Sequence, residues 1–234
     1  MGRTMDVGTD EEVGSSSSES EESGNNSEES EEQEEEKVDQ SDLISAINDS
    51  QVDTVQELLE RGRSSGIYLN RKSTPKDETP LMLAVKTGSK RLVDIVLGFG
   101  PFLNEKDHEG RTALHIAAWH GYGPISKALL KAGANPRAKD TGIKNTPLIF
   151  AARQGHRVVV QELMKKGANT KDMDKWDYTA LHYAARNGHL SVVKELVDEW
   201  GAKVGAKTDT GHSPRALARN KGHTSVVNFL SKKM

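Results

Sequence analysis

One short phrase recurs five times along this chain, at steps of 33 or 34 residues. The copies read TPLMLA from Thr79, TALHIAA from Thr112, TPLIFAA from Thr146, TALHYAA from Thr179 and SPRALA from Ser213. Each of the first four copies is followed by a glycine, a stretch rich in Val and Leu, and a second glycine. A fixed phrase at a fixed period of this length indicates stacked supersecondary units, each stabilised by its neighbours.

Each unit reads as two helices joined by turns. A threonine such as Thr112 precedes the first helix, where its hydroxyl can accept a hydrogen bond from an unpaired backbone N–H. Proline, as in Pro147, occupies the first helical turn, where a missing N–H costs nothing. Leu114, Ala117 and Ala118 are spaced i, i+3 and i+4, so they form one narrow apolar face that lets a neighbouring helix approach closely. A glycine after the phrase, where a left-handed residue is favoured, predicts the end of this helix.

The second helix of each unit carries a wider aliphatic stripe. The predicted stripes are Val158, Val159, Leu163 and Met164 in one unit, and Val192, Val193, Leu196 and Val197 in the next. No unit can bury both of its helices alone, so we expect the stability to come from repeats and the interfaces between neighbours.

The period and the phrase resemble those of the ankyrin-repeat family. The resemblance implies an all-α solenoid of helix-turn-helix repeats with short β-hairpin tips. It covers nearly everything after residue 40, because an earlier unit without the phrase fits the same frame. In that unit, Leu43 to Ile47 predict a first helix, and Val52 to Leu59 predict a second helix that closes at Gly62. We expect six repeats, including two caps, at approximately 41–70, 77–106, 110–139, 144–173, 177–207 and 211–234.

The chain departs from the repeat pattern at three places. The connection over residues 63–76 is several residues longer than normal, and single residues are inserted near Ile143 and near Trp200. Because Trp200 follows a Val/Leu stripe beside one of these insertions, we expect it to fill a packing gap.

Charge is divided unevenly along the chain. Residues 1–40 hold 15 acidic residues and two basic ones, and the remainder holds 20 acidic and 30 basic residues. The first segment is rich in Glu and Ser and has no aromatic residue, so it cannot bury enough apolar surface to offset the entropy of ordering it. We therefore predict a disordered acidic tail over 1–40 and an ankyrin-repeat domain over 41–234. The tail's acidity is typical of a solvating tail, of a segment that folds back on the basic solenoid, and of a shield for a basic client.

Composition also limits the cellular compartments in which the protein can be expected. The chain has no cysteine, which removes disulfides and thiolate metal sites and favours the cytoplasm, the nucleus or both. No apolar run approaches the length of a membrane span. We expect a monomer.

The eight histidines invite a catalytic or metal-binding interpretation, but the repeat accounts for most of them. His115 and His182 occupy the phrase's own histidine position, and the resemblance implies that their ring nitrogens hold the turn together. The sequence contains no paired carboxylates in an apolar setting, no phosphate-binding glycine loop and no nucleophile elbow. We expect no catalytic residue, no cofactor and no metal site, and hence no enzyme.

The resemblance to this family implies that partners bind to the hairpin tips and to the exposed ends of the first helices. The residues there are mostly cationic, with two tryptophans and a tyrosine, and Trp and Arg dominate binding hot spots. Trp119 is the first candidate anchor and Trp176 the second. The candidate partner-binding residues are Lys86, Arg111, Trp119, His120, Arg153, Gln154, Trp176, Tyr178, Arg186 and Asn187.

Three functions fit these observations. The first is a non-catalytic interaction module or adaptor whose groove binds a protein with an acidic surface and apolar pockets. The second is a chaperone or assembly factor that uses the acidic tail on a basic client of the histone or ribosomal-protein type. The third is nucleic-acid binding by the basic solenoid, which charge favours but for which no motif is present. Deleting residues 1–40 discriminates between them.

Overall fold

The structure is a computed structural model that describes residues 39–65, 69–72 and 74–234. The predicted disordered tail lies outside these residues, except for Asp39 and Gln40. Gln40 begins the first helix, and the carboxylate of Asp39 caps it by accepting from the backbone N–H of Ser41 at 3.1 Å. The helix therefore begins one residue before the predicted start of the repeat domain.

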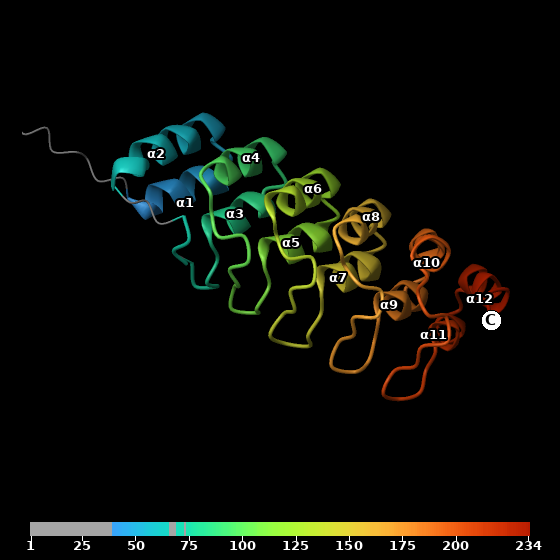
Figure 1. The fold of residues 1–234 in the computed structure, drawn as a ribbon. Helices are drawn as coiled ribbons and strands as arrows, with labels where there is room; N and C mark the ends of the chain where they lie inside the picture. Colours follow the sequence, from blue (N-terminus) through green and yellow to red (C-terminus); the bar gives the residue numbers. More distant parts are fainter. Residues whose placement is uncertain (1–38, 66–68, 73) are drawn as a thin grey trace, which may run out of the picture. The chain divides into compact units, whose positions relative to one another are not determined.

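Six pairs of helices are stacked along residues 40–231, in an inner and an outer layer (Figure 1). The inner layer holds α1 (Gln40–Asn48), α3 (Pro80–Lys86), α5 (Ala113–His120), α7 (Pro147–Gln154), α9 (Ala180–Arg186) and α11 (Pro214–Asn220). The outer layer holds α2 (Val52–Ser65), α4 (Lys90–Gly98), α6 (Gly123–Ala132), α8 (Arg157–Lys165), α10 (Leu190–Lys194) with η1 (Glu195–Glu199), and α12 (Thr224–Ser231). The loops between pairs extend beyond the inner layer as a row of tips. This is the predicted all-α ankyrin-type solenoid of six repeats.

The inner helices begin as the phrase predicts. The hydroxyls of Thr79, Thr146 and Ser213 each accept from a backbone N–H three residues later, at 3.3 to 3.4 Å. A proline follows each of them as the first helical residue. Small, fully buried residues then form the seam between neighbouring inner helices: Ala84, Ala117, Ala118, Ala151, Ala152, Ala184, Ala185 and Ala218.

In two inner helices, a histidine three residues after the threonine completes a capping box. The Nδ1 atom of His115 accepts the backbone N–H of Thr112 at 3.1 Å, and its Nε2 lies 3.2 Å from the carbonyl oxygen of Asn145 in the next tip. His182 and Thr179 repeat the arrangement. Burial lowers the pKa of His115 to about 4, so its ring is neutral at pH 7. The two histidines therefore hold turns together, as the family resemblance implied.

A second set of histidines joins each repeat to the one before it. Gly121 ends α5 at a φ of 76°, and a Cβ added to it would lie 2.5 Å from the ring of His156. The Nε2 atom of His156 lies 3.0 Å from the carbonyl oxygen of Trp119. His189 and His223 make the same contact with the carbonyl oxygens of Arg153 and Arg186. Glycine is required because it leaves room for the ring and accepts a positive φ.

Two predictions about the outer layer are wrong. The helix α2 does not close at Gly62 but continues to Ser65. Val158 does not belong to the buried stripe of α8, because it is 60% exposed, and the buried positions are Val159, Val160 and Leu163. Val159 and Leu163 share one face at i and i+4, and Val158, one position earlier, is turned away from it.

The residue inserted near Trp200 is absorbed by a π-helical segment. The helix α10 continues as η1, in which the wider i→i+5 turn accommodates an extra residue. The segment buries Glu195, whose carboxylate accepts from Arg157 at 2.8 Å, Gln161 at 3.0 Å and Trp200 at 3.2 Å. Trp200 is half-buried beside it. The insertion is thus accommodated by a local change of helix type and a buried polar cluster.

Backbone hydrogen bonds connect the tips in a row. In each pair, the carbonyl oxygen of a residue in one tip accepts from a backbone N–H in the next tip, at 2.9 to 3.2 Å. The pairs, with the acceptor first, are Lys76 and His108, Glu109 and Thr141, Ile143 and Lys175, and Trp176 and Asp209. Within the described residues, β-pairing in the tips is limited to one isolated antiparallel bridge, between Met173 and Thr179. The tips are therefore hairpin turns stabilised mainly by their neighbours.

Candidate protein-binding groove

The eighth position of each phrase copy lies at the end of an inner helix. In order along the chain, these residues are Lys86, Trp119, Arg153, Arg186 and Asn220. All of them are exposed except Arg153, which is half-buried. We call the surface formed by these helix ends and the adjoining tips the groove.

A pocket of about 510 Å³ opens in this groove between α5, α7 and the tips. Its apolar wall comes from Ile116, Trp119, Ile143 and Phe150. It gathers five of the ten predicted partner-binding residues: Lys86, Arg111, Trp119, His120 and Arg153. The pocket is within the size range of small-molecule sites, about 300–1,000 Å³, and its apolar wall gives it room for a large apolar side chain.

Arg153 is held between two aromatic rings. Its guanidinium carbon lies 5.7 Å from the centre of the Trp119 ring and 5.5 Å from that of Tyr183. The ring of Trp119 in turn stands edge-on to Phe150 at 5.5 Å. Stacking of this kind orders an arginine while its N–H groups stay available.

Among the residues that the structure describes, neither Arg153 nor Arg186 has a carboxylate partner. Both lie near Tyr183, whose hydroxyl donates to Asp174 at 2.7 Å. Burial of Tyr183, together with the hydrogen bond and the charge of Asp174, raises its pKa, and the positive charges of Arg153 and Arg186 oppose that rise. This end of the groove therefore carries two cations that are not neutralised.

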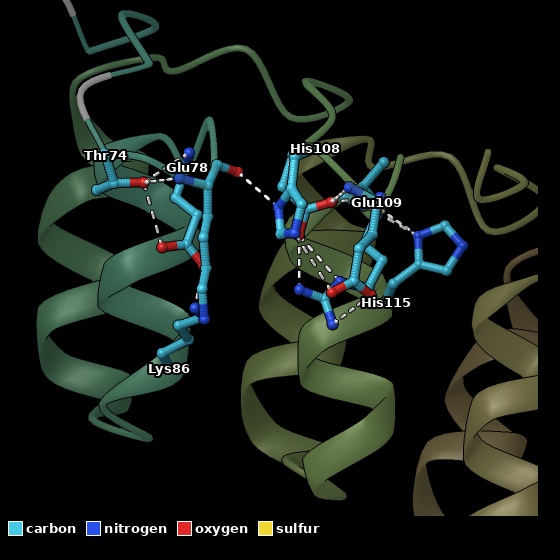
Figure 2. Close-up of polar contacts among 10 residues, drawn as sticks. Thr74, Glu78, Lys86, His108, Glu109 and His115 are labelled. Carbon is cyan, nitrogen blue, oxygen red and sulfur yellow. Dashed lines mark hydrogen bonds and ion pairs between the residues drawn. The ribbon is translucent and has the colours of Figure 1, made fainter. Parts of the chain in front are cut away.

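The other end of the groove differs, because its cations are already paired (Figure 2). The ammonium of Lys86 forms an ion pair with the buried Glu78, which also accepts from the hydroxyl of Thr74 at 3.3 Å. Arg111 pairs with Asp107 at 2.9 Å and with Glu109 at 3.0 Å. The predicted cationic face is thus neutralised on this side.

His120, at the rim of the pocket, is a poor cation. Partial burial first, and then the positive groups of its neighbours, lower its pKa below the usual value. Its ring stacks on that of Tyr122 at 5.3 Å. His120 therefore contributes a flat, mostly neutral surface.

Trp176 and Tyr178 lie outside the pocket, on the next tip. Trp176 is 41% exposed, and the ammonium of Lys175 lies 4.5 Å from its ring. Tyr178 is half-buried, and its ring centre lies 5.2 Å from that of Tyr183. Both can extend a binding surface toward the later repeats.

Two further predicted residues lie at helix ends. Gln154 is the half-buried last residue of α7. The amide of Asn187 donates to the carbonyl oxygen of Arg153 at 2.7 Å, so it connects two inner helices. Its side chain therefore has a structural task that the sequence did not indicate.

The sequence reasoning missed the residues that form the groove floor. These occupy the fifth position of the phrase: Ile116, Phe150 and Tyr183. They are between 4% and 9% exposed, and their side chains support the candidate anchors. The available signal was that side-chain size varies at this position, up to Phe150 and Tyr183, whereas the position after it is alanine in all five copies.

The comparison with family models agrees with this geometry. A model described as "Ankyrin repeats (3 copies)" matches residues 43–140 and again residues 138–208. The chain belongs to the ankyrin-repeat family. Repeats of this family generally mediate protein–protein interaction, so the ankyrin groove is the natural place to look for a partner site.

Curated relatives resemble this ankyrin chain over part of its length. Glycerophosphocholine phosphodiesterase gde1 of Schizosaccharomyces pombe is 33% identical over 59% of the chain and 12% of its own length. Human inversin is 33% identical over 61% of the chain and 13% of its own length. Human ankyrin repeat domain-containing protein 63 is 32% identical over 57% of the chain and 37% of its own length. The aligned segments cover well under two thirds of these relatives.

Metal sites and membrane-spanning helices are two other features that a chain of this kind could carry. Within the described residues, no three His, Cys, Asp or Glu side chains are grouped so that they could hold a metal ion. None of the described ankyrin helices combines the length and the apolar character that crossing a bilayer requires.

Proposed function

We propose that this ankyrin-repeat chain is a non-catalytic adaptor whose groove binds a protein partner with an acidic surface and apolar pockets or side chains. The observation that carries the proposal is the arrangement of Trp119, Phe150 and Arg153 around one pocket. The repeat scaffold needs Leu, Ala, Gly and Thr at its own positions, but it gives no reason for an exposed tryptophan beside an arginine that has no carboxylate partner among the described residues.

The two kinds of residue play different parts. Exposed aromatic anchors supply most of the affinity of an interface, because they bury a large area against the partner. Arg153 and Arg186 attract an acidic surface and set its orientation, which mainly raises the association rate. The pairing of Lys86 and Arg111 with neighbouring carboxylates focuses this attraction on the later repeats.

The test is affinity capture from lysate followed by binding kinetics on the captured partner. We expect Trp119→Ala to weaken binding by at least about 2 kcal/mol, a hot-spot magnitude. Arg153→Glu with Arg186→Glu should mainly slow association and reduce its salt dependence.

The matched control lies in the outer layer. Lys165 and Lys166 are exposed at the end of α8, and reversing both charges should leave binding unchanged. Binding that survives the groove changes and is lost in this control would place the site on the outer layer.

A second function, suggested by the acidic composition of residues 1–40, is a chaperone for a basic client. Deleting residues 1–38, which keeps the Asp39 cap of α1, distinguishes the two. Adaptor binding should barely change, and capture of a basic client should be lost. Stronger binding of nucleic acid by the shortened chain would instead favour an electrostatic role for the basic repeats.

A further inference from the structure

Three successive repeats present, at equivalent positions, an anchor and two arginines that pair with no carboxylate in the part of the chain that the structure describes. Trp119, Arg153 and Arg186 each occupy the eighth position of the phrase, at the ends of α5, α7 and α9. Packed helices lie about 8–10 Å apart, axis to axis. The helix ends that carry the three residues therefore follow one another at about that distance, while the guanidinium of Arg153 leans back to 5.7 Å from the centre of the Trp119 ring.

A polyproline II segment has this repeat. It has three residues per turn and rises about 3.1 Å per residue, so side chains three positions apart lie on one face at about 9 Å spacing. A β-strand follows the helix ends less closely, because its side chains share a face at every second position, about 6.6–6.8 Å apart.

The proposed function supplies the groove as the binding site, and on that basis we propose a register for its ligand. The groove recognises an extended, polyproline II-like segment of a partner protein that carries one large apolar side chain, with carboxylates three and six residues away on the same side. The apolar side chain enters the pocket against Trp119 and Phe150. The two carboxylates then meet Arg153 and Arg186.

The residues at the two ends of the row of eighth positions indicate that the ligand's carboxylates lie only on the late side of its apolar side chain. On the early side of Trp119, the equivalent residue is Lys86, which Glu78 already neutralises. On the late side of Arg186, the equivalent residue is the uncharged Asn220. A carboxylate should therefore help at the two positions that face Arg153 and Arg186 and nowhere else along the row.

The pairing with carboxylates also fits the state of Arg153. Its guanidinium is already ordered between Trp119 and Tyr183, so binding costs less side-chain entropy than it would for a free arginine. A guanidinium can also bind a carboxylate through two parallel hydrogen bonds, which reward correct placement.

A helical ligand is the competing geometry. Side chains seven positions apart on a helix lie about 10.5 Å apart on one face, which also approaches the repeat distance. The extended form is favoured because the pocket lies between two inner helices on one side and the tip residues Thr141 and Ile143 on the other. A helix, about 10–12 Å wide with its side chains, would stand above this crevice.

The experiment uses fluorescently labelled synthetic peptides and the full chain, measured by fluorescence anisotropy. Each peptide contains one Phe and two Glu in a Ser background. The Glu residues are placed two and four, three and six, or seven and fourteen positions from the Phe, in both chain directions. We expect the three-and-six peptide, in one direction, to bind at least about tenfold tighter than the other spacings, or about 1.4 kcal/mol.

Variants assign each contact. Arg153→Gln should remove the benefit of the nearer Glu, measured against a peptide with Gln there, and Arg186→Gln should remove only that of the farther Glu. Trp119→Ala should weaken every Phe-containing peptide, and Lys165→Gln with Lys166→Gln should weaken none.

The outcomes separate this inference from the proposed function. Binding that depends on Trp119 but not on Glu spacing, or no binding of any peptide, overturns the register. A preference for seven and fourteen overturns the extended form. Peptide binding that is indifferent to Trp119, Arg153 and Arg186 alike contradicts the groove as a binding site and so overturns the proposed function as well.

Discussion

The guanidinium of Arg153 lies over the ring of Trp119, at 5.7 Å from its centre, although the two residues are a full repeat apart in the chain. The ring is 40% exposed, so it contributes to the protein surface as well as to the fold. Beneath it, Phe150 is 9% exposed and packs against Trp119 and His115. Trp119 is therefore an exposed anchor, and Phe150 is the buried floor that supports it.

This difference in burial predicts that alanine substitutions at the two positions lower the free energy of unfolding by different amounts. Phe150→Ala should reduce the free energy of unfolding by about 3–5 kcal/mol, since it removes a core aromatic ring. Trp119→Ala should cost about 1–2 kcal/mol, because the side chain is already 40% exposed and the aromatic pair adds only about 0.5–1.5 kcal/mol. Urea melts of the two variants decide this, and equal losses would show that Trp119 is a core residue.

The close packing of His156 on Gly121 predicts a second difference. Gly121→Ala and Gly100→Ala both place a side chain at a φ between 70° and 80°, which costs about 1–2 kcal/mol for a residue other than glycine. Only at Gly121 would the new Cβ also collide with a ring, because nothing lies within 4 Å of a Cβ at Gly100. Gly121→Ala should therefore lower the melting temperature further.

The contribution of the ring is isolated by a double variant. In the background of His156→Ala, the two glycine substitutions should become similar in cost. A difference that persists without the His156 ring would mean that the backbone of the turn, and not the inter-repeat contact, accounts for it.

His115 predicts a dependence of stability on pH. Its pKa is lowered to about 4 in the folded chain by burial, so the unfolded state, with a pKa near 6.5, binds the proton more tightly. The contribution of His115 is therefore complete above about pH 6.5 and is lost as the pH falls toward 4, by up to about 3 kcal/mol.

The chain itself suggests the control for this prediction. Met82 and Ile149 occupy the position of His115 in neighbouring repeats, so His115→Met is compatible with the scaffold. Its unfolding free energy should fall less steeply between pH 6.5 and 4 than that of the wild type. The pKa of His182 is also lowered by burial and leaves the same background slope in both proteins. Parallel curves would contradict the prediction.

The buried Glu195 predicts a loss of stability when its partner is removed. Burial raises the pKa of its carboxyl. The hydrogen bonds from Arg157, Gln161 and Trp200 together lower that pKa by more than burial raises it, so the net shift is downward. Its contribution is therefore present above the unfolded pKa, about 4.3, and is lost as the pH falls below it. Arg157→Gln should destabilise the chain by about 1 kcal/mol or more at pH 7, because the hydrogen bond is to a charged group.

At pH 3 this difference should shrink, since Glu195 is then closer to protonation. Lys207→Gln removes one exposed positive charge elsewhere and serves as the control, with little change expected at either pH. A loss of the same size at both pH values would mean that Arg157 acts through packing and not through the charge of Glu195.

Local chemistry alone determined the repeated frame of this protein. The phrase around Thr112, Thr146 and Thr179 predicts where each inner helix begins, and the following glycines predict where it ends. These are properties of neighbouring residues in the chain, namely capping, ring geometry and left-handed turns. The burial of the alanine seam follows from the same spacing.

The tertiary structure decided which groove residues are free to bind. Lys86 and Arg153 occupy the same position of the phrase, yet one is neutralised by Glu78 and the other is stacked between Trp119 and Tyr183. That difference depends on side chains brought together from different repeats and tips, which no local pattern encodes. The same holds for the π-helical segment beside Trp200, because a helix can absorb an inserted residue only if its neighbours, here Arg157 on α8, pair with the carboxylate that it buries.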